Sequence, residues 1–322
     1  MVRTVLHSLS WLGLVVLLLA GLTLAACEDR APAPGAGPDG KSAKPMPGQR
    51  IVCMSPAITQ MLIELDCADR IVGLNQFDAA AAELDAKVVG DLYDFEYERL
   101  ISVDPTDILL QPAHTGVPQK LRDMAEANHW RIHEYRLETI ADVMRAMSPT
   151  GQGVPAVVNA TPRGREVMDR FLRQLEQVGK AVDAKDPGLS VRTLVLVGVN
   201  PMTAAGPGTF IDEMLTLVRG RNAIVDNANA YPVLDKEAIV TLDPDVIVVV
   251  HTDPGAAPDR MPAALASLDV RAVNEGHVRW LADPHALLPT TSVPRVMAKL
   301  ARVLHPEVAD RIDRMLQENE SP

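Results

Sequence analysis

Cysteine and aromatic residues are scarce in this chain. Its 322 residues include only 3 cysteines, and phenylalanine, tryptophan and tyrosine together make up 3% of the sequence. This scarcity excludes a cysteine-based metal site. Cys53 falls in an expected first strand and Cys67 at the far end of the helix that follows. Two buried thiols are therefore favoured, although an oxidising compartment would allow the pair to form a disulfide.

Positively charged residues are fewer than negatively charged ones. The chain has 31 lysines and arginines against 42 aspartates and glutamates, which gives a net charge of -11. Such a chain is repelled by phosphate backbones and by anionic lipid head groups. The composition therefore argues against nucleic acid and against an anionic membrane surface as partners.

Sequence motifs of enzymes are missing as well. There is no nucleophile elbow, no His-Glu-x-x-His and no evident pair of catalytic carboxylates. The turn Gly206-Pro207-Gly208-Thr209 could present backbone N–H groups to an anion. It lacks the further glycines and the lysine of a nucleotide-binding loop, so the start of a helix explains it better. An enzyme is therefore disfavoured.

Only one long apolar run occurs, from Leu12 to Ala26. It is short for a membrane span and has the layout of a signal peptide, with Arg3 and His7 before it. The run ends in Leu24-Ala25-Ala26-Cys27, which resembles a bacterial lipobox and implies a lipid on Cys27. Residues 28–49 are rich in Pro, Ala, Gly and Lys, as in a disordered tether. We expect an exported protein that is attached to a membrane only through this lipid, while the sequence leaves open which membrane holds it.

One segment of the chain occurs twice. Glu98-Arg99-Leu100-Ile101-Ser102-Val103-Asp104-Pro105 returns as Glu237-Ala238-Ile239-Val240-Thr241-Leu242-Asp243-Pro244, and an apolar run follows each copy. Each copy predicts a short helix, an Asp-Pro break and a buried strand. A spacing of more than a hundred residues is too long for a solenoid repeat, so it indicates a duplicated lobe.

From Arg50 onward, expected strands and helices alternate, which predicts an α/β fold with mainly parallel sheets. Between the two halves, apolar residues from Val167 to Val182 recur at three- and four-residue steps, as on one long amphipathic helix. We expect this helix alone to cross between two similar lobes, permitting modest rocking. The predicted organisation is a signal peptide (1–26), a tether (27–49), an N-terminal lobe (50–160), a connecting helix (161–187) and a C-terminal lobe (188–322). Ser148 to Pro162 is expected to be a loop of unknown role.

Several segments, in order, resemble one family. They are Arg50 to Leu62, Arg70-Ile71-Val72-Gly73, Leu100 to Leu110, Gly208 to Leu215, Asp243-Pro244-Asp245 and Leu304-His305-Pro306-Glu307. The chain is similar over these residues to the iron-chelate and vitamin B12 class of periplasmic substrate-binding proteins. The resemblance implies two lobes joined by one backbone helix, and an ABC permease with its ATPase as partners.

The resemblance also implies acidic residues on the outer surface of each lobe, where they meet arginines of the permease. In the second lobe the matching helix carries Asp212 and Glu213. The matching helix of the first lobe begins Pro118-Gln119-Lys120 and has no acid before Asp123 and Glu126. Solvated helix faces would explain these four residues equally well.

Candidate ligand-binding residues follow the expected strands. Ligands of open parallel sheets bind beyond the carboxyl ends of the strands. This rule selects eight residues: Ser55, Phe77, Tyr93, His114, Asn200, Tyr231, His251 and His285. Ser55 and Asn200 each precede a proline after the first strand of a lobe, where helix capping is the alternative role.

The chemistry of these candidates fits a metal chelate. Tyr93, Phe95 and Tyr97 concentrate aromatic side chains in five positions, and their faces would suit a flat macrocycle or a catecholate. His114, His251 and His285 are candidate metal ligands, since histidine is the commonest one. No tight spacing of His or Asp predicts a closed zinc site.

These features lead to a functional hypothesis. We expect a monomeric, lipid-anchored receptor with no intrinsic cofactor, which delivers a metal chelate or corrinoid to an ABC import permease. An iron-siderophore or haem-type chelate is slightly favoured over cobalamin, because histidine and tyrosine outnumber tryptophan near the gap. The alternatives are an envelope lipoprotein with a sensory or ligand-handover role and, less favoured, an envelope enzyme.

Overall fold

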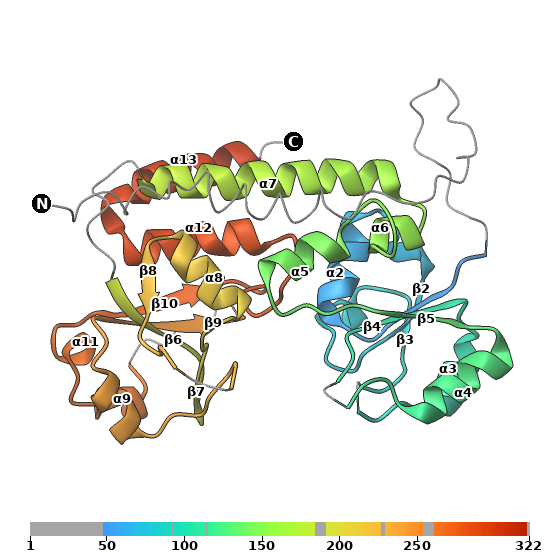
Figure 1. The fold of residues 1–322 in the computed structure, drawn as a ribbon, viewed down its shortest axis with the longest axis horizontal. Coiled ribbons are helices and arrows are strands. Elements are labelled where there is room, and N and C mark those ends of the chain that lie inside the picture. Colours follow the sequence, from blue (N-terminus) through green and yellow to red (C-terminus); the bar gives the residue numbers. More distant parts are fainter. Residues whose placement is uncertain are drawn as a thin grey trace, which may run out of the picture. The chain divides into compact units, whose positions relative to one another are not determined.

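The computed structural model describes residues 48–91, 93–113, 115–183, 191–226, 229–253 and 261–320. These residues form two α/β lobes joined by one long helix (Figure 1). Within these ranges no helix is long and apolar enough to cross a membrane. The predicted signal peptide, the lipid-bearing Cys27 and the tether as far as residue 47 lie outside the described residues, so they stay predictions.

The first lobe is built on a five-stranded sheet of order β3-β2-β1-β4-β5, in which every neighbouring pair is parallel. Apolar runs such as Ile51-Val52-Cys53 are buried on both faces, as parallel strands between helices require. The strands are β1 (Ile51–Cys53), β2 (Ile71–Leu74), β3 (Lys87–Val88), β4 (Asp107–Leu110) and β5 (Arg131–Glu134). The helices are α2 (Pro56–Glu64), α3 (Tyr97–Val103) and α4 (Gln119–Asn128), with 3-10 turns at Ala68–Arg70 and Ala79–Ala82.

The second lobe is built on a mixed sheet of order β10-β9-β6-β7, with β8 paired to β6. Only β7 runs antiparallel to its neighbour among these strands, because a tight turn at Asn200-Pro201 folds it back on β6. The strands are β6 (Val191–Val199), β7 (Met202–Ala204), β8 (Gly220–Asn222), β9 (Val246–His251) and β10 (Val278–Ala282). The helices are α8 (Phe210–Leu217), α9 (Lys236–Leu242), α10 (Ala263–Ala266) and α11 (Arg271–Asn274).

The duplication seen in the sequence is present in the backbone. In the first lobe β1 lies between β2 and β4, with β5 beyond β4; in the second, β6 lies between β8 and β9, with β10 beyond β9. The repeated segments form α3 and α9. Both helices end at an aspartate in the left-handed conformation, Asp104 with φ 41° and Asp243 with φ 38°, and a proline follows each. The matching elements confirm that the two lobes share an order of strands.

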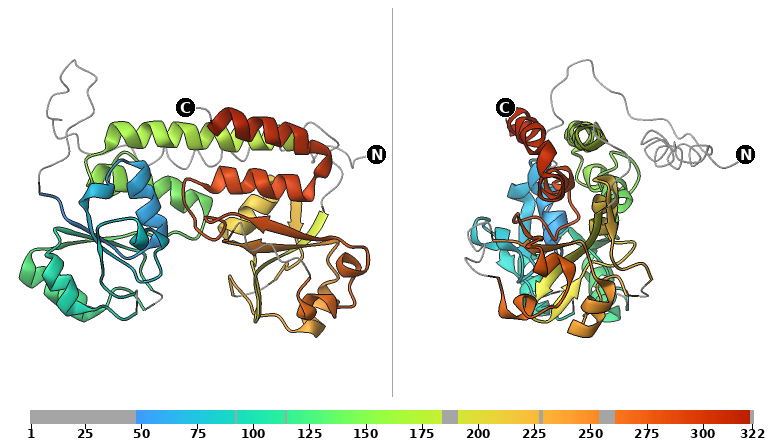
Figure 2. Two further views of the ribbon diagram at one scale, coloured as in Figure 1. Left: turned by 180° about the vertical axis from the view of Figure 1, so that it is seen from behind. Right: turned by 90° about the vertical axis from the view of Figure 1, so that its left-hand side faces the viewer.

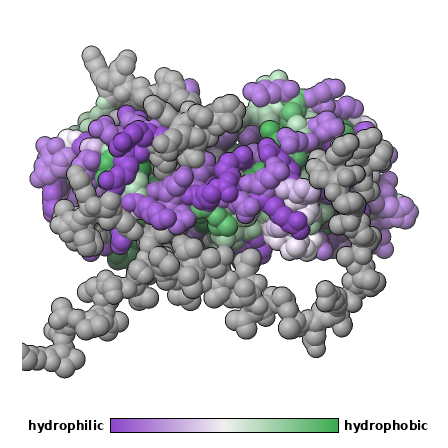
Figure 3. All heavy atoms as spheres, turned by 90° about the horizontal axis from the view of Figure 1, so that it is seen from above, coloured by the Kyte–Doolittle hydropathy of each residue, from purple (hydrophilic) through white to green (hydrophobic). Residues whose placement is uncertain are grey.

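The long connecting helix is α7 (Thr161–Asp183), close to the bounds expected from the apolar pattern. Its buried stripe includes Val167, Phe171 and Val178. Two later helices, α12 (Val293–Leu304) and α13 (Ala309–Glu320), pack along it (Figure 2). The Arg311 guanidinium donates to the Ala181 carbonyl at 3.0 Å. Figure 3 views the molecule from above relative to Figure 1 and shows a band of hydrophilic side chains across that face.

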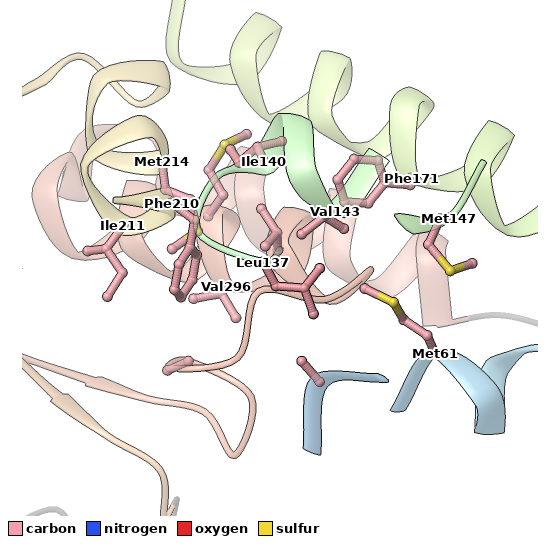
Figure 4. Close-up of a cluster of buried hydrophobic side chains, with 14 of the residues drawn as sticks. Met61, Leu137, Ile140, Val143, Met147, Phe171, Phe210, Ile211, Met214 and Val296 are labelled. Atoms are coloured by element: carbon pink, nitrogen blue, oxygen red, sulfur yellow. The ribbon is translucent and has the colours of Figure 1, made fainter. Parts of the chain in front are cut away.

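A hydrophobic cluster continues under α7 from one lobe to the other. It joins Met61 of α2, Val143 of α5 (Ile140–Ala146), Phe171 of α7, Met214 of α8 and Val296 of α12 (Figure 4). The chain passes from the first sheet to the second through α7, but side chains of both lobes also pack directly. The expectation that α7 alone spans the two lobes was therefore incomplete.

Two local features differ from what the sequence indicates. The apolar residues 223–225 are typical of a strand, but β8 ends at Asn222. The Asn222 side chain ends it, because its Oδ1 accepts the Ile224 N–H at 3.0 Å and its Nδ2 donates to the Ala205 carbonyl at 3.1 Å. The segment from Ser148 to Pro162 was expected to be a loop, yet it contains the short helix α6 (Val154–Val157), whose Val154 is fully buried.

Both cysteines of the described chain are free and buried, which confirms the expectation of two thiols. Burial raises the pKa of Cys53 to about 12. The Cys53 thiol donates to the Ser55 carbonyl at 3.4 Å. These cysteines therefore act as small apolar residues of the core.

Candidate functional site

Each sheet turns the carboxyl ends of its parallel strands toward the other lobe. The chain that leaves β5 reaches Glu138, whose carbonyl accepts the Phe210 N–H of the second lobe at 2.8 Å. The chain that leaves β10 reaches Thr291, whose hydroxyl donates to the Glu64 carboxylate of the first lobe at 2.7 Å. Because the carboxyl ends of parallel strands share one edge of a sheet, both edges face the region between the lobes. Ligands of open parallel sheets bind at such edges.

The first lobe presents two aromatic side chains at this edge. Phe77 follows β2 and is 75% exposed, and Tyr93 follows β3 and is 80% exposed. The backbone beside Tyr93 is fixed, because the Asp91 Oδ1 accepts the N–H of Tyr93 at 2.8 Å and of Asp94 at 2.9 Å. These two bonds lower the pKa of Asp91. The N–H groups of Tyr93 and Asp94 are therefore bonded, while the ring of Tyr93 stays open to solvent.

The loops that carry these aromatic rings are tied to each other. The Gln76 N–H donates to the Gly90 carbonyl at 2.8 Å, and the Gln76 side chain donates to the Asp91 carboxylate at 2.7 Å. Gly90 has φ +108°, and a Cβ there would lie 2.3 Å from the Asp94 carbonyl oxygen. Only glycine fits this close approach. Phe77 and Tyr93 are thus held on adjacent, mutually bonded loops.

The second lobe contributes a matching apolar surface. Val225 is 78% exposed, Val233 is 64% exposed and Tyr231 is 39% exposed. The chain around Val233 pairs with β7, since the Leu234 N–H donates to the Met202 carbonyl at 2.8 Å. Burial and the nearby Glu138 carboxylate raise the pKa of Tyr231 to about 12.

Glu138 belongs to the first lobe, so Tyr231 lies where the lobes meet. Asn200, also predicted to face the gap, is exposed in the turn between β6 and β7.

His285 belongs to a network of polar side chains. The Arg295 guanidinium donates to the His285 Nδ1 at 2.9 Å and to the buried Asp283 carboxylate at 3.0 Å. Lys299 donates to the same carboxylate at 2.7 Å. Burial and then the Arg295 charge lower the pKa of His285, so the ring is neutral at neutral pH. Its Nδ1 is already used as an acceptor.

His251 is also held within the fold. Its ring lies 4.9 Å from the ring of Trp280, and its Nε2 is buried with no hydrogen-bond partner among the described residues. His114 lies outside the described residues, so its predicted role is untested. Within the described ranges, no cluster of three or more His, Cys, Asp or Glu residues could hold a metal ion.

Ser55 precedes α2 in extended conformation, but its side chain does not cap the helix. It is buried, and its carbonyl accepts the Thr59 N–H at 3.0 Å. The alternative role of helix capping is therefore wrong for Ser55, and contact with a ligand stays a prediction.

The acidic residues considered for permease docking differ in their surroundings. On α8, Asp212 accepts hydrogen bonds from the Gly208 N–H at 3.0 Å and the Asn222 side chain at 2.9 Å. Glu213 accepts the Ile140 N–H of the first lobe at 2.6 Å. Both carboxylates are thus engaged inside the protein. On α4, Asp123 and Glu126 are exposed, and Asp123 accepts from the Gln119 side chain at 2.7 Å.

A better matched pair of acids, which is not among the docking residues predicted from the sequence, lies on the repeated helices. Glu98 on α3 and Glu237 on α9 occupy the same position of the repeated segment, and both are exposed. In the part of the chain that the structure describes, neither carboxylate forms an ion pair. Ile101 and Val240 are likewise equivalent in the repeat, and both are exposed. The repeat itself was the signal that could have identified these residues.

Comparison with known proteins gives a consistent picture. A sequence model of the family described as periplasmic binding protein matches residues 51–284. A cobalamin-binding protein of Halobacterium salinarum is 26% identical over 273 residues, which cover 80% of this chain and 69% of that protein. The solved structure of the periplasmic haem-binding protein BhuT with two haems aligns with a TM-score of 0.67 at 22% identity, covering 81% of this chain and 99% of that chain. The periplasmic vitamin B12 binding protein BtuF of Vibrio cholerae aligns with a TM-score of 0.60 at 15% identity, covering 85% and 98%.

Proposed function

The chain belongs to the periplasmic binding protein family, and from this premise we propose that it captures a corrinoid between its lobes for an ABC import permease. It is a substrate-binding protein of the class that serves importers of vitamin B12, haem and iron chelates. The family places it outside the cytoplasm. Lipid attachment through Cys27 would keep it close to the permease.

The exposed aromatic residues at the facing sheet edges carry this proposal. Large apolar side chains that stay exposed in a folded protein mark binding surfaces when they gather at one place. Phe77 and Tyr93 lie on one edge, and Tyr231, Val225 and Val233 lie on the other. A corrin ring is wide and flat, with amide groups around its rim. Aromatic rings from both lobes would cover its faces, while the polar loop residues would bond to the rim.

The choice of a corrinoid rests on His251 and His285, the two candidate histidines that the structure describes. A haem or a bare iron chelate gains affinity when a protein side chain coordinates its metal. His285 uses its Nδ1 to accept from Arg295, and the Nε2 of His251 is buried against the fold. In a cobalamin the metal is already coordinated by groups of the ligand itself. The sequence slightly favoured iron chelates, and these surroundings shift our preference to a corrinoid, in keeping with the name of the Halobacterium relative.

A haem-type chelate is the second candidate, and Tyr93 is the observation in its favour. Its ring is 80% exposed, its backbone N–H is bonded to Asp91, and a phenolate can bind haem iron. In that case haemin would bind tightly, and Tyr93→Phe would change its absorption spectrum. Binding of haemin with an unchanged spectrum in Tyr93→Phe would remove the support that this residue gives.

The permease would dock through the repeated helices α3 and α9. A partner with two-fold symmetry presents two equivalent surfaces, and the duplicated lobes offer two equivalent acids, Glu98 and Glu237. Arginines of the permease would pair with them. The double variant Glu98→Arg with Glu237→Arg should bind ligand normally and fail in transport, whereas Asp123→Arg with Glu126→Arg serves as a charge-matched control. Normal transport by the first variant would exclude this docking surface.

A titration tests the ligand proposal directly. The purified protein would be titrated with cyanocobalamin, haemin and a ferric siderophore while heat release is recorded. Saturable binding of cyanocobalamin at micromolar concentration or below, with weaker or absent binding of the other two, is the expected result. Tight binding of haemin alone would replace the corrinoid by the second candidate, and no binding of any compound would contradict both.

A further inference from the structure

Two helices begin at the junction of the lobes and exchange hydrogen bonds across it. The Ile140 N–H at the start of α5 in the first lobe donates to the Glu213 Oε2 of the second lobe at 2.6 Å. In return, the Phe210 N–H at the start of α8 donates to the Glu138 carbonyl of the first lobe at 2.8 Å. Each lobe thus gives one first-turn N–H group to the other.

Each helix also has a local cap at its start. In α5 the Thr139 hydroxyl accepts the Asp142 N–H at 3.1 Å, and the Asp142 carboxylate accepts the Thr139 N–H at 3.1 Å. In α8 the Thr209 hydroxyl accepts the Asp212 N–H at 3.2 Å. Such capping leaves the N–H of the first helical residue without a partner inside its own helix. Ile140 and Phe210 therefore depend on the opposite lobe.

Carboxylates gather around this contact. Glu213 lies close enough to Asp142 of α5 and to Asp212 of its own helix to be repelled by both charges. Asp142 forms an ion pair with Arg145, and the Glu138 side chain forms one with Arg136 at 3.1 Å. Glu213 itself has only the Ile140 N–H as a partner among these groups.

Burial, and then the charges of Asp142 and Asp212, raise the pKa of Glu213 against the opposing effect of the Ile140 N–H. Ionised Glu213 is therefore held in the junction at a cost in electrostatic free energy.

We propose that the Ile140–Glu213 and Phe210–Glu138 hydrogen bonds form one latch that opens as a unit when the lobes rock, and that protonation of Glu213 tightens it. The proton removes the cost of burying a charge, which is the largest effect, and also the repulsion from Asp142 across the junction. The neutral carboxyl group keeps an oxygen that accepts the Ile140 N–H. The two lobes of an extracytoplasmic receptor would thus be coupled more firmly in an acidic medium.

The sign of the pH effect follows from linkage. A carboxyl group whose pKa is higher in the folded than in the unfolded chain binds protons more readily when folded. Glu213 therefore adds to the free energy of unfolding as the pH falls from neutral toward its ordinary value of 4.5. Below that value both states are protonated, and the gain stops growing.

Amide hydrogen exchange tests the coupling of the two bonds. In Glu213→Ala the Ile140 N–H loses its acceptor and should exchange faster, by about tenfold for a lost bond to a charged group. The Phe210 N–H should exchange faster by a similar factor, although its acceptor is the unaltered backbone carbonyl of Glu138. Unchanged exchange at Phe210 would show that the bonds open independently and would overturn the latch. Protection of the β4 amides reports whether this variant stays folded.

A pH series of thermal unfolding tests the proton linkage. Glu213→Gln keeps an acceptor for Ile140 but carries no charge at any pH. The Tm of the unmodified protein, relative to that of Glu213→Gln, should rise as the pH falls from about 8 to about 5. The exposed Glu83→Gln variant is the matched control and should follow the unmodified protein throughout. Parallel curves for the unmodified protein and Glu213→Gln would overturn the linkage. Neither experiment requires a ligand, so both stand whatever the outcome of the titrations above.

Discussion

Replacement of phenylalanine by alanine can be compared at a buried site, Phe171, and at an exposed site, Phe77. Phe171 of α7 is 1% exposed and packs in the cluster that joins the lobes (Figure 4), whereas Phe77 is 75% exposed at the sheet edge. Replacing a buried phenylalanine by alanine removes apolar contacts and leaves a cavity, at a cost of about 3–5 kcal/mol. For Phe171→Ala we expect a Tm lower by roughly 6–20 °C, given about 2–4 °C per kcal/mol for chains of this size.

Phe77→Ala should leave stability almost unchanged and weaken ligand binding instead. An exposed side chain with few contacts changes the free energy of unfolding by less than about 0.5 kcal/mol. If its ring covers one face of the ligand, its loss should weaken cyanocobalamin binding by about 1–2 kcal/mol, or roughly five- to thirtyfold. Calorimetric unfolding and calorimetric titration of both variants separate the two roles. Unchanged affinity in Phe77→Ala, or equal destabilisation by both substitutions, would refute the assignment of this edge to the ligand.

Three further predictions concern stability and the thiols. Asp107 is fully buried with Arg131 and His133 as partners, and these hydrogen bonds lower its pKa despite its burial. At pH values above about 4, the pKa of an aspartate in the unfolded chain, Asp107→Asn should therefore lower the free energy of unfolding by about 3–5 kcal/mol, as measured by unfolding in urea. The difference between the variant and the unmodified protein should shrink as the pH falls below that value, because the stabilising carboxylate becomes protonated. Thr139→Ala should cost about 1 kcal/mol through loss of its cap, and a smaller effect from Thr139→Ser would confirm that the hydroxyl is responsible. Cys53, whose pKa is raised to about 12, should resist a thiol reagent at pH about 8 until the protein is unfolded; rapid labelling of the folded protein would contradict its burial.

Much of the fold was predictable because patterns among neighbouring residues indicate its helices and strands. The continuous apolar run of β9 and the spacing from Val167 to Val178 on α7 each agree with a single kind of element. The repeated segment also predicted two lobes with the same order of strands. These features depend on neighbours in the sequence, which is why they could be read without a structure.

Other features depend on partners that are distant in the sequence. The end of β8 is set by the Asn222 side chain, which bonds to Ala205 and to Asp212. Direct packing between the lobes depends on α5 and α8, which lie about seventy positions apart along the chain. Hydrophobic periodicity reports that such helices bury a face, but it does not say against what.

The predicted site residues differ in what the structure says of their surroundings. Phe77, Tyr93 and Tyr231 were selected by the strand-end rule, and all three are exposed at the facing edges. Their contact with a ligand remains a prediction. Glu213 was selected as an outward-facing acid, yet its carboxylate bonds to Ile140 across the junction. Helical position alone did not reveal this, because the partner belongs to the other lobe.

Binding of a corrinoid between the facing sheet edges is the central claim, and quenching of tryptophan fluorescence tests it most directly. Trp130 lies in the first lobe and Trp280 in the second, so a ligand between the lobes that absorbs tryptophan emission should quench both. In a Trp130→Phe and a Trp280→Phe variant, with inner-filter correction, cyanocobalamin should produce saturable quenching with the same dissociation constant. Addition of Phe77→Ala should weaken binding in both. Saturable quenching of only one tryptophan, with no effect of Phe77→Ala, would place the ligand outside the inter-lobe region and contradict the account.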